Sequence, residues 1–191
     1  KYCNVLRERY PIYQDRFEIS EGVNPYYLAQ RLKHLLPEDA IIVVGNSCAC
    51  VCMLQMGVEK EGQRLWGNVN CGTMGYDLPA AIGAAVASKR CVICITGDGS
   101  IQMNLQELQT VVTNGIHVKL IIFNNGGYHA IVQTQMNFFG RLSGCTGESG
   151  LSIPDFSRIS SAYGIPYYKC TENEQVDTVL NEFLDSEGYG L

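Results

Sequence analysis

The sequence predicts an α/β protein with three layers, α/β/α, around a mainly parallel sheet. Apolar runs of strand length recur at residues 40–44, 92–96 and 118–123. Amphipathic segments of helix length separate these runs, and this alternation is typical of βαβ units around a parallel sheet. With 191 residues, of which 46% are hydrophobic, the chain can bury one sizeable core.

The first half of the chain predicts three helices and one strand. Asn24 is a favoured N-cap and Pro25 suits the first helical position, so a helix is expected to begin there and to end before Pro37. Residues 40–44 form a continuous apolar strand, and a helix is expected after it. Residues 78–88 are rich in alanine, which predicts a helix packed closely against the sheet.

The second half predicts two further strands, at residues 92–96 and 118–123. The segment 103–113 between them is expected to form one helix, which Asn114-Gly115 closes. The sequence Thr171-Glu-Asn-Glu174 is a capping-box pattern that opens a last helix, and the glycines near the C-terminus end it.

One loop and the domain boundaries follow from the same pattern. The glycine-rich stretch 140–150 is expected to be a mobile loop. The α/β pattern predicts one more strand after the last helix. Residues 21–191 are therefore interpreted as one domain that is truncated before its last strand, and residues 1–20 as a linker segment from a preceding domain.

Composition and charge exclude several classes of protein. The formal net charge is −5 and no run of Lys and Arg occurs, so no nucleic-acid partner is expected. The longest apolar runs are far shorter than the roughly 20 residues that cross a bilayer, so no membrane partner is expected either. The first residues are charged and tyrosine-rich, unlike a signal peptide, and we predict a cytoplasmic protein.

The nine cysteines are interpreted as free thiols of a reducing compartment. Cys91 and Cys94 would point to opposite faces of a strand. Cys48, Cys50 and Cys52 have no neighbouring histidine, so small core residues are preferred to a zinc site.

Two polar clusters follow successive strands, Gly97-Asp-Gly-Ser100 and Asn124-Asn-Gly-Gly127. The carboxyl ends of neighbouring parallel strands meet at the crevice where α/β sheets bind ligands, so Asp98 and Asn125 are expected to face each other across roughly 5 Å. A carboxylate, an amide oxygen and a backbone carbonyl near Gly127 form a partial set of hard ligands. Such a set suits Mg²⁺ carried by a diphosphate.

The glycines of both clusters would let backbone approach phosphate oxygens, and Ser100 is expected to stand just before a helix whose N-terminal amides favour anions. The alternative is ordinary turn chemistry, because Asp, Asn and Gly end many strands. A nucleotide-binding module is not supported, since neither GxGxxG after a strand nor GxxxxGK[ST] occurs.

GDG followed by NN, with Asn125 lying 27 positions after Asp98, resembles the thiamine-diphosphate motif. The stretches 71–83, 97–125 and 153–156 are similar to acetolactate synthases, so the chain resembles the C-terminal diphosphate-binding (PP) domain of that family. The resemblance implies thiamine diphosphate and Mg²⁺ as cofactors, with Asp98, Asn125 and the carbonyl of Gly127 as metal ligands. It also implies diphosphate contacts from Gly97, Gly99 and Ser100, with Tyr128 beside them.

The resemblance further implies that Gly72, Thr73 and Met74 hold the aminopyrimidine ring. The Gly72 carbonyl would bind the exocyclic amine and the Met74 amide a ring nitrogen. The Met74 side chain would enforce a bent cofactor, so Gly72 and Met74 serve cofactor activation. Phosphate contacts from Asn46 and Ser47 are a further expectation.

His129 and Gln133 follow the metal loop at helical spacing, and they face either substrate or solvent.

The family's parent enzyme decarboxylates a 2-keto acid and transfers the acyl carbanion to a carbonyl acceptor, which could be another keto acid or a keto sugar. Its activating glutamate lies in a pyrimidine-binding domain, usually of a partner subunit, so this chain alone is expected to be inactive. The parent is expected to be a homodimer or homotetramer. Alternatives are a simple 2-keto acid decarboxylase split over two subunits and a non-catalytic domain that has lost cofactor use.

Overall fold

The computed structural model describes residues 2–191, and a single parallel sheet lies at its centre. The strands follow the order β2-β1-β3-β4, and each pair of neighbours is parallel. Their bounds are β1 (Ile41–Val44), β2 (Arg64–Gly67), β3 (Val92–Gly97) and β4 (Val118–Phe123). The sequence pattern predicted β1, β3 and β4, whereas the short edge strand β2 was not foreseen.

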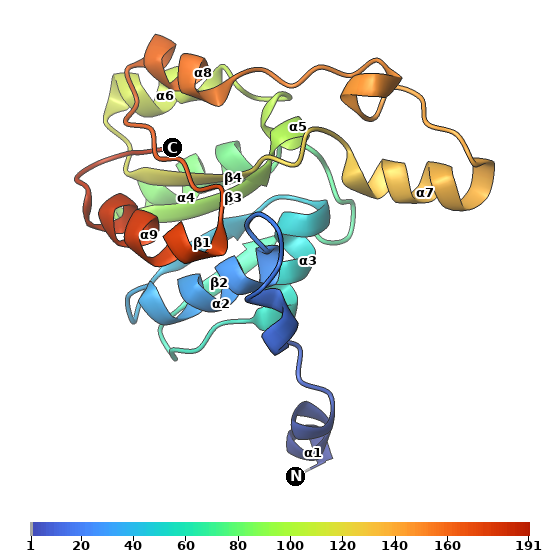
Figure 1. The fold of residues 1–191 in the computed structure, drawn as a ribbon. Helices are drawn as coiled ribbons and strands as arrows, with labels where there is room; N and C mark the ends of the chain where they lie inside the picture. Colours follow the sequence, from blue (N-terminus) through green and yellow to red (C-terminus); the bar gives the residue numbers. More distant parts are fainter. Residues whose placement is uncertain (1) are drawn as a thin grey trace.

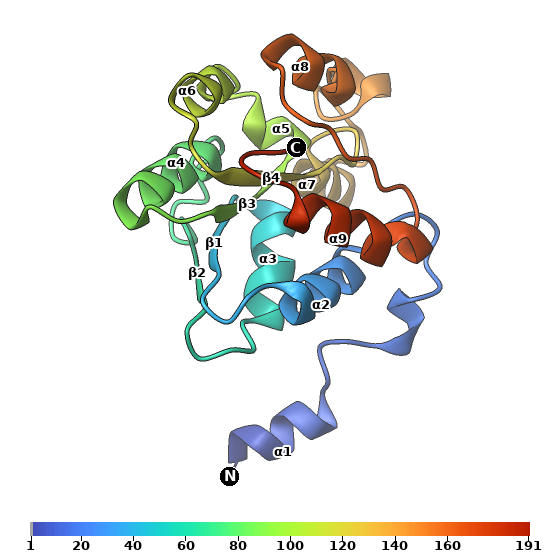
Figure 2. The ribbon, with the colours of Figure 1, turned by 90° about the vertical axis from the view of Figure 1, so that its left-hand side faces the viewer.

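Helices cover both faces of the sheet, so the predicted three-layer α/β/α fold is confirmed (Figures 1 and 2). One face carries α2 (Pro25–Leu35), α3 (Ser47–Met56) and α9 (Val176–Asp185). The other carries α4 (Asp77–Ser88), α6 (Glu107–Asn114) and α8 (Phe156–Tyr163).

Alternate residues of β1 belong to the two opposite cores. Ile41 and Val43 pack with the α4 side, and Ile42 and Val44 pack with the α2 and α3 side. A strand buried on both faces reads as a continuous apolar run because each side chain meets a hydrophobic layer.

The start of α2 confirms the predicted cap. The Asn24 side chain accepts hydrogen bonds from the amides of Tyr26 and Tyr27, and Pro25 occupies the first helical position. These bonds satisfy amides that have no partner within the helix.

The helix predicted at residues 103–113 begins later than expected. A short helix, α5 (Asp98–Ile101), follows β3 directly, and α6 starts only at Glu107. Between them the side-chain amide of Asn104 donates to the carbonyl of Gly75 at 2.6 Å. This contact with a distant segment holds residues 102–106 in turns and displaces the helix start.

The predicted capping box at Thr171 is wrong. The Thr171 amide and hydroxyl both donate to Oε1 of Gln175, and a 3₁₀ turn, Asn173–Gln175, precedes α9. The buried Asn173 side chain donates to the carbonyls of Phe17 and Glu18 instead. A long-range contact of this kind leaves no signal in local spacing, and α9 also ends at Asp185, before the C-terminal glycines.

The N-terminal helix α1 (Tyr2–Arg9) stands away from the body, as Figure 1 shows. The 3₁₀ helix Asp15–Phe17 returns to the body, where the Phe17 ring stacks on Tyr26 with centroids 5.0 Å apart. Among residues 2–191, no helix combines the length and the apolar character that crossing a membrane requires. All nine cysteines are free thiols, and Cys91 is exposed while Cys94 is buried.

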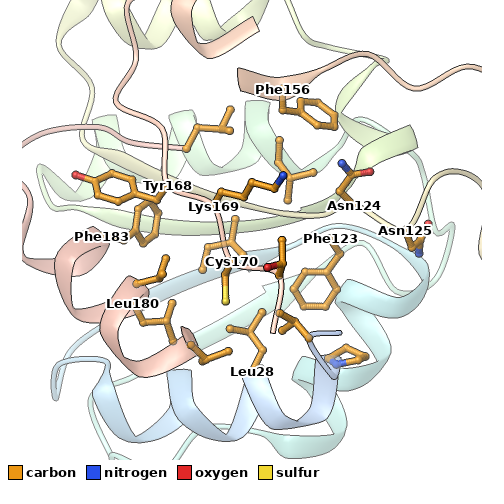
Figure 3. A pocket seen from close by; sticks show the side chains of 18 of the residues that line it. Leu28, Phe123, Asn124, Asn125, Phe156, Tyr168, Lys169, Cys170, Leu180 and Phe183 are labelled. Carbon is orange, nitrogen blue, oxygen red and sulfur yellow. The ribbon is translucent and has the colours of Figure 1, made fainter. Parts of the chain in front are cut away.

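A cavity of about 620 Å³ opens between β4, α9 and the segment 167–171 (Figure 3). Apolar side chains such as Leu28, Phe123 and Phe183 line it. Along this edge of β4, Gly190 forms a parallel bridge with Lys119, and the Leu120 amide donates to the Gly190 carbonyl.

Candidate functional site

Asp98 joins the two polar loops at the carboxyl ends of β3 and β4. Its side chain is 2% exposed. One carboxylate oxygen accepts the Gly99 amide at 2.7 Å, and the other accepts the amides of Gly126 and Gly127 at 2.7 and 3.0 Å. The structure therefore brings together the two clusters that the sequence singled out, and a single carboxylate holds them.

Two opposing effects act on the pKa of Asp98. Burial raises the pKa, because a low-dielectric surrounding disfavours the charged form. Hydrogen bonds from backbone amides of residues 99, 125, 126 and 127 oppose this effect, yet the net pKa stays above its ordinary value. A cation bound next to this carboxylate would lower its pKa again, because an opposite charge favours the ionised form.

Gly127 occupies a position that no larger residue could fill. Its φ is +152°, and a Cβ there would lie 2.2 Å from the carbonyl oxygen of Cys145. The Tyr128 amide donates to that same carbonyl, and Gly127 bridges Thr146. The stretch predicted as a mobile loop is thus tied by backbone contacts to the loop that follows β4.

Tyr128 lies against the first turn of α5. A Cβ added to Gly99 would approach the Tyr128 ring to 2.3 Å, so glycine is what allows this close contact.

The Asn125 side chain is exposed, and Figure 3 shows it with Asn124 at the carboxyl end of β4. The carbonyl of Gly127 accepts the amide of His129 at 3.2 Å and keeps a second lone pair.

Ser100 differs from its expected placement. It lies within α5, not before a helix, and is 3% exposed. Its hydroxyl donates to a carboxylate oxygen of Asp77 at 2.7 Å and accepts the Gly75 amide at 2.9 Å. The hydroxyl is therefore engaged inside the protein, because a serine carries a single proton to donate.

The segment predicted to hold the pyrimidine ring is largely exposed to solvent. Gly72, with φ +57°, and Thr73 are exposed, while Met74 is half-buried. The Asn46 side chain donates to the Gly72 carbonyl at 3.2 Å, so the end of β1 and this segment meet at one site. Asn68 donates to the Thr73 hydroxyl at 3.0 Å.

Ser47, the first residue of α3, is exposed and has φ +54°. Few residues other than glycine adopt this left-handed conformation, and it is frequent where function constrains the backbone. The two residues predicted to face substrate or solvent, His129 and Gln133, lie on α7 (His129–Phe139), and both are exposed.

Two residues of this region were not singled out from sequence. Asn104 holds the Gly75 carbonyl, and Asp77 accepts three hydrogen bonds in the interior. The available signal for Asp77 was a lone carboxylate at the start of an alanine-rich helix, where an exposed position is the usual expectation.

The ligand set predicted from sequence consists of the Asp98 carboxylate, the side-chain amide of Asn125 and the carbonyl of Gly127. These are oxygen ligands of the kind that Mg²⁺ takes together with phosphate and water. Within residues 2–191, no group of three or more His, Cys, Asp and Glu side chains is placed to hold a metal ion.

Comparison with known proteins gives a consistent result. Residues 44–191 match the family model "Thiamine pyrophosphate enzyme, C-terminal TPP binding domain". The chain is 41% identical over 190 residues to the acetolactate synthase isozyme 2 large subunit of Escherichia coli K12, covering 98% of this chain and 34% of that protein. It is 33% identical over 185 residues to the acetolactate synthase of Mycobacterium bovis, covering 95% of this chain and 30% of that protein.

The chain therefore spans about a third of the length of these relatives. The motif, the sheet topology and the match over residues 44–191 agree. This chain belongs to the thiamine pyrophosphate enzyme family and contains the C-terminal TPP-binding domain of its acetolactate synthase-like members.

Proposed function

We propose that this domain binds Mg²⁺ and thiamine diphosphate in an acetolactate synthase-like enzyme. That enzyme decarboxylates a 2-keto acid and transfers the acyl carbanion to a carbonyl acceptor. The observation that carries the proposal is the buried Asp98 carboxylate, which holds the loops after β3 and β4 together through three backbone amides. Relatives named as acetolactate synthases support the reaction class.

In this proposal Asp98, Asn125 and the Gly127 carbonyl hold Mg²⁺. The backbone at Gly97, Gly99 and Ser100 approaches the diphosphate, with Tyr128 beside it and Asn46 and Ser47 at the opposite rim. When bound, thiamine diphosphate supplies the carbon nucleophile that attacks the keto group and retains the electron pair after CO₂ leaves.

Gly72, Thr73 and Met74 orient the pyrimidine side of the cofactor. The exposure of Gly72 and Thr73 supports the proposal that the pyrimidine-binding domain of a partner subunit covers this segment. We accordingly propose a homodimeric or homotetrameric parent in the cytoplasm, and an isolated chain that does not turn over. His129 and Gln133 stay candidates for substrate contact, since both lie near the loop on an exposed helix.

We also propose the domain division that the sequence pattern suggested, with residues 1–20 as a linker segment and residues 21–191 as the binding domain. The exposure of α1 supports a linker. The cavity beside β4 supports one further strand, because Gly190 already pairs with β4 and the Tyr168 amide donates to the Leu191 carbonyl on the other side. An extended segment between these two edges would complete both ladders.

Titration calorimetry of the chain with thiamine diphosphate, with and without Mg²⁺, tests the proposal. We expect Mg²⁺-dependent binding that Asp98→Ala weakens at least tenfold, about 1.4 kcal/mol. Asp155→Ala is the matched control, because Asp155 is a surface carboxylate that also accepts a backbone amide. Equal binding by wild type and Asp98→Ala, or no heat at millimolar cofactor, would contradict the proposed site.

A further inference from the structure

We propose that Asp77 is a positioning residue, whose buried carboxylate orients the segment 72–75 toward the diphosphate loop through the Ser100 hydroxyl. The role rests on the proposed function, because it concerns where the pyrimidine-contacting segment stands relative to the diphosphate. Asp77 itself contacts no ligand in this proposal. It acts through Ser100 and, beyond it, through the Gly75 amide.

Asp77 is 0% exposed at the carboxyl edge of the sheet. One oxygen accepts the hydroxyls of Thr96 and Ser100, each at 2.7 Å, and the other accepts the Leu78 amide at 2.9 Å. A Cβ added to Gly45 would lie 2.4 Å from the same carboxylate, so glycine at the end of β1 makes room for it. The carboxylate thus contacts the ends of β1 and β3 and the start of α4.

The Ser100 hydroxyl links the Asp77 carboxylate to the segment 72–75. Because its proton is directed at Asp77, its oxygen is left to accept the Gly75 amide. That amide belongs to the peptide group that follows Met74. The direction of the Ser100 proton therefore decides whether the Gly75 amide, which follows Met74, has a hydrogen-bond acceptor in a fixed position.

A second contact holds Gly75 from the other side. The Asn104 side chain donates to the Gly75 carbonyl at 2.6 Å. Gly75 has φ +79°, and a Cβ there would approach the Met103 Cβ to 2.6 Å. Asp77 and Asn104 together fix both peptide groups that flank Gly75, while residues 71–73 ahead of it are exposed.

A carboxylate is needed for this arrangement, and an amide of the same shape does not suffice. Two hydroxyl donors and one amide donor point at the Asp77 oxygens, which only accept. An asparagine would keep its oxygen for the Leu78 amide and present its NH₂ group to the hydroxyls of Thr96 and Ser100. The Ser100 hydroxyl would then turn, and its oxygen would accept the new donor. Burying a carboxyl group is costly unless its oxygens are hydrogen-bonded, and here three donors satisfy them.

The test compares Asp77→Asn with Thr96→Val in the full chain. Thr96→Val removes a hydrogen bond to the same carboxylate oxygen but leaves the path to Gly75 intact. Two quantities are measured: the hydrogen-exchange rate of the Gly75 amide by NMR without ligand, and the dissociation constants of thiamine diphosphate and of inorganic diphosphate, both with Mg²⁺. Inorganic diphosphate has no pyrimidine ring, so it reports on the diphosphate loop alone.

We expect Asp77→Asn to speed exchange of the Gly75 amide about tenfold or more. We expect it to weaken thiamine diphosphate about fivefold, the loss of one hydrogen bond, while inorganic diphosphate changes by less than about twofold. Thr96→Val should lower the unfolding temperature, but it should not weaken thiamine diphosphate more than inorganic diphosphate. Ser100→Ala should reproduce the faster Gly75 exchange of Asp77→Asn, and it carries this part of the test should Asp77→Asn fail to fold.

Unchanged Gly75 exchange in both Asp77→Asn and Ser100→Ala would overturn the positioning role. Equal weakening of both ligands would overturn it too, since that result indicates general damage to the site. If the wild type binds neither ligand while the Gly75 amide still exchanges faster in the variants, the proposed function fails. The result would still support the proposal that Asp77 positions the segment 72–75.

Discussion

The two loops that Asp98 joins and the segment 71–74 lie at the same edge of the sheet, yet they are held in different ways. Asp98, Gly99 and Gly127 are buried, and amide donors fill both oxygens of one carboxylate. Residues 71–73 are exposed, and hydrogen bonds with Asn46 and Asn68 hold them: one from the Asn46 side chain, two with the Asn68 side chain and one from the Gly72 amide to the Asn68 carbonyl. The proposed diphosphate side is thus formed by the chain itself, whereas the proposed pyrimidine side is anchored mainly at Gly75.

This difference has a physical basis in what each side would bind. A phosphate is recognised by backbone amides and a cation, which one polypeptide can arrange around a buried carboxylate. A segment that binds a ring between two domains must expose one face until the second domain binds. An exposed face leaves the segment with few contacts to its own domain.

The largest effect is expected for Gly127→Ala. The substitution places a Cβ 2.2 Å from the Cys145 carbonyl in a conformation with φ +152°, so we expect a loss of about 3 kcal/mol in the free energy of unfolding. Urea unfolding measures it. Gly126→Ala is the control, because that residue has φ +79° but no atom within 4 Å of the added Cβ, and its loss should be nearer 1 kcal/mol, roughly. Equal losses would mean that the Cys145 contact does not constrain the loop.

A smaller effect is expected for Gly99→Ala, which forces the Tyr128 ring away from α5. The added Cβ would meet the ring at 2.3 Å, and the side chain can move aside, so we expect a loss of about 1–2 kcal/mol. Gly97→Ala lies two residues earlier, with open space around its Cβ, and should change stability far less. Tyrosine fluorescence during unfolding would follow both variants, and similar losses for the two would argue against the ring contact.

The exposed segment should respond weakly to the loss of its own contacts. We expect Asn46→Ala, which removes the hydrogen bond to the Gly72 carbonyl, to change the free energy of unfolding by less than about 0.5 kcal/mol. Thermal unfolding would measure the change. A loss above roughly 1.5 kcal/mol would show that the segment 71–74 is held as firmly as the Asp98 loops.

Asp155 provides a surface reference for Asp98, and its effect should be the smallest. It caps α8, where the Ser157 hydroxyl and amide donate to it and lower its pKa. A carboxyl with a lowered pKa contributes stability above its ordinary titration range, and that contribution is lost as the pH falls through the folded-state pKa. Asp155→Ala should therefore lower the unfolding temperature slightly at pH 7 and lose this difference in acid, whereas Asp155→Asn should retain the cap. A difference that grows in acid would contradict the assignment.

Much of the fold was accessible from local pattern. The apolar runs at β1, β3 and β4 predicted buried strands because each is covered on both faces. The meeting of Asp98 with the loop after β4 followed from chain order, since neighbouring parallel strands end at one edge.

Features that depend on distant contacts were missed or misplaced. The start of α6 shifted because Asn104 reaches Gly75, and the capping box failed because Asn173 turns to the N-terminal segment. Edge strand β2 is short and half-exposed, so it lacks the long apolar run that marks a buried strand.

The sequence by itself determined the fold class, the family and the two polar loops, because these depend on local periodicity and on the order of strands. Only the tertiary structure decided that the Ser100 hydroxyl turns inward and that Asp77 lies behind it, sheltered by Gly45. The direction of a hydroxyl proton depends on which acceptor lies within 3 Å, roughly, and that acceptor is 23 positions away in the chain.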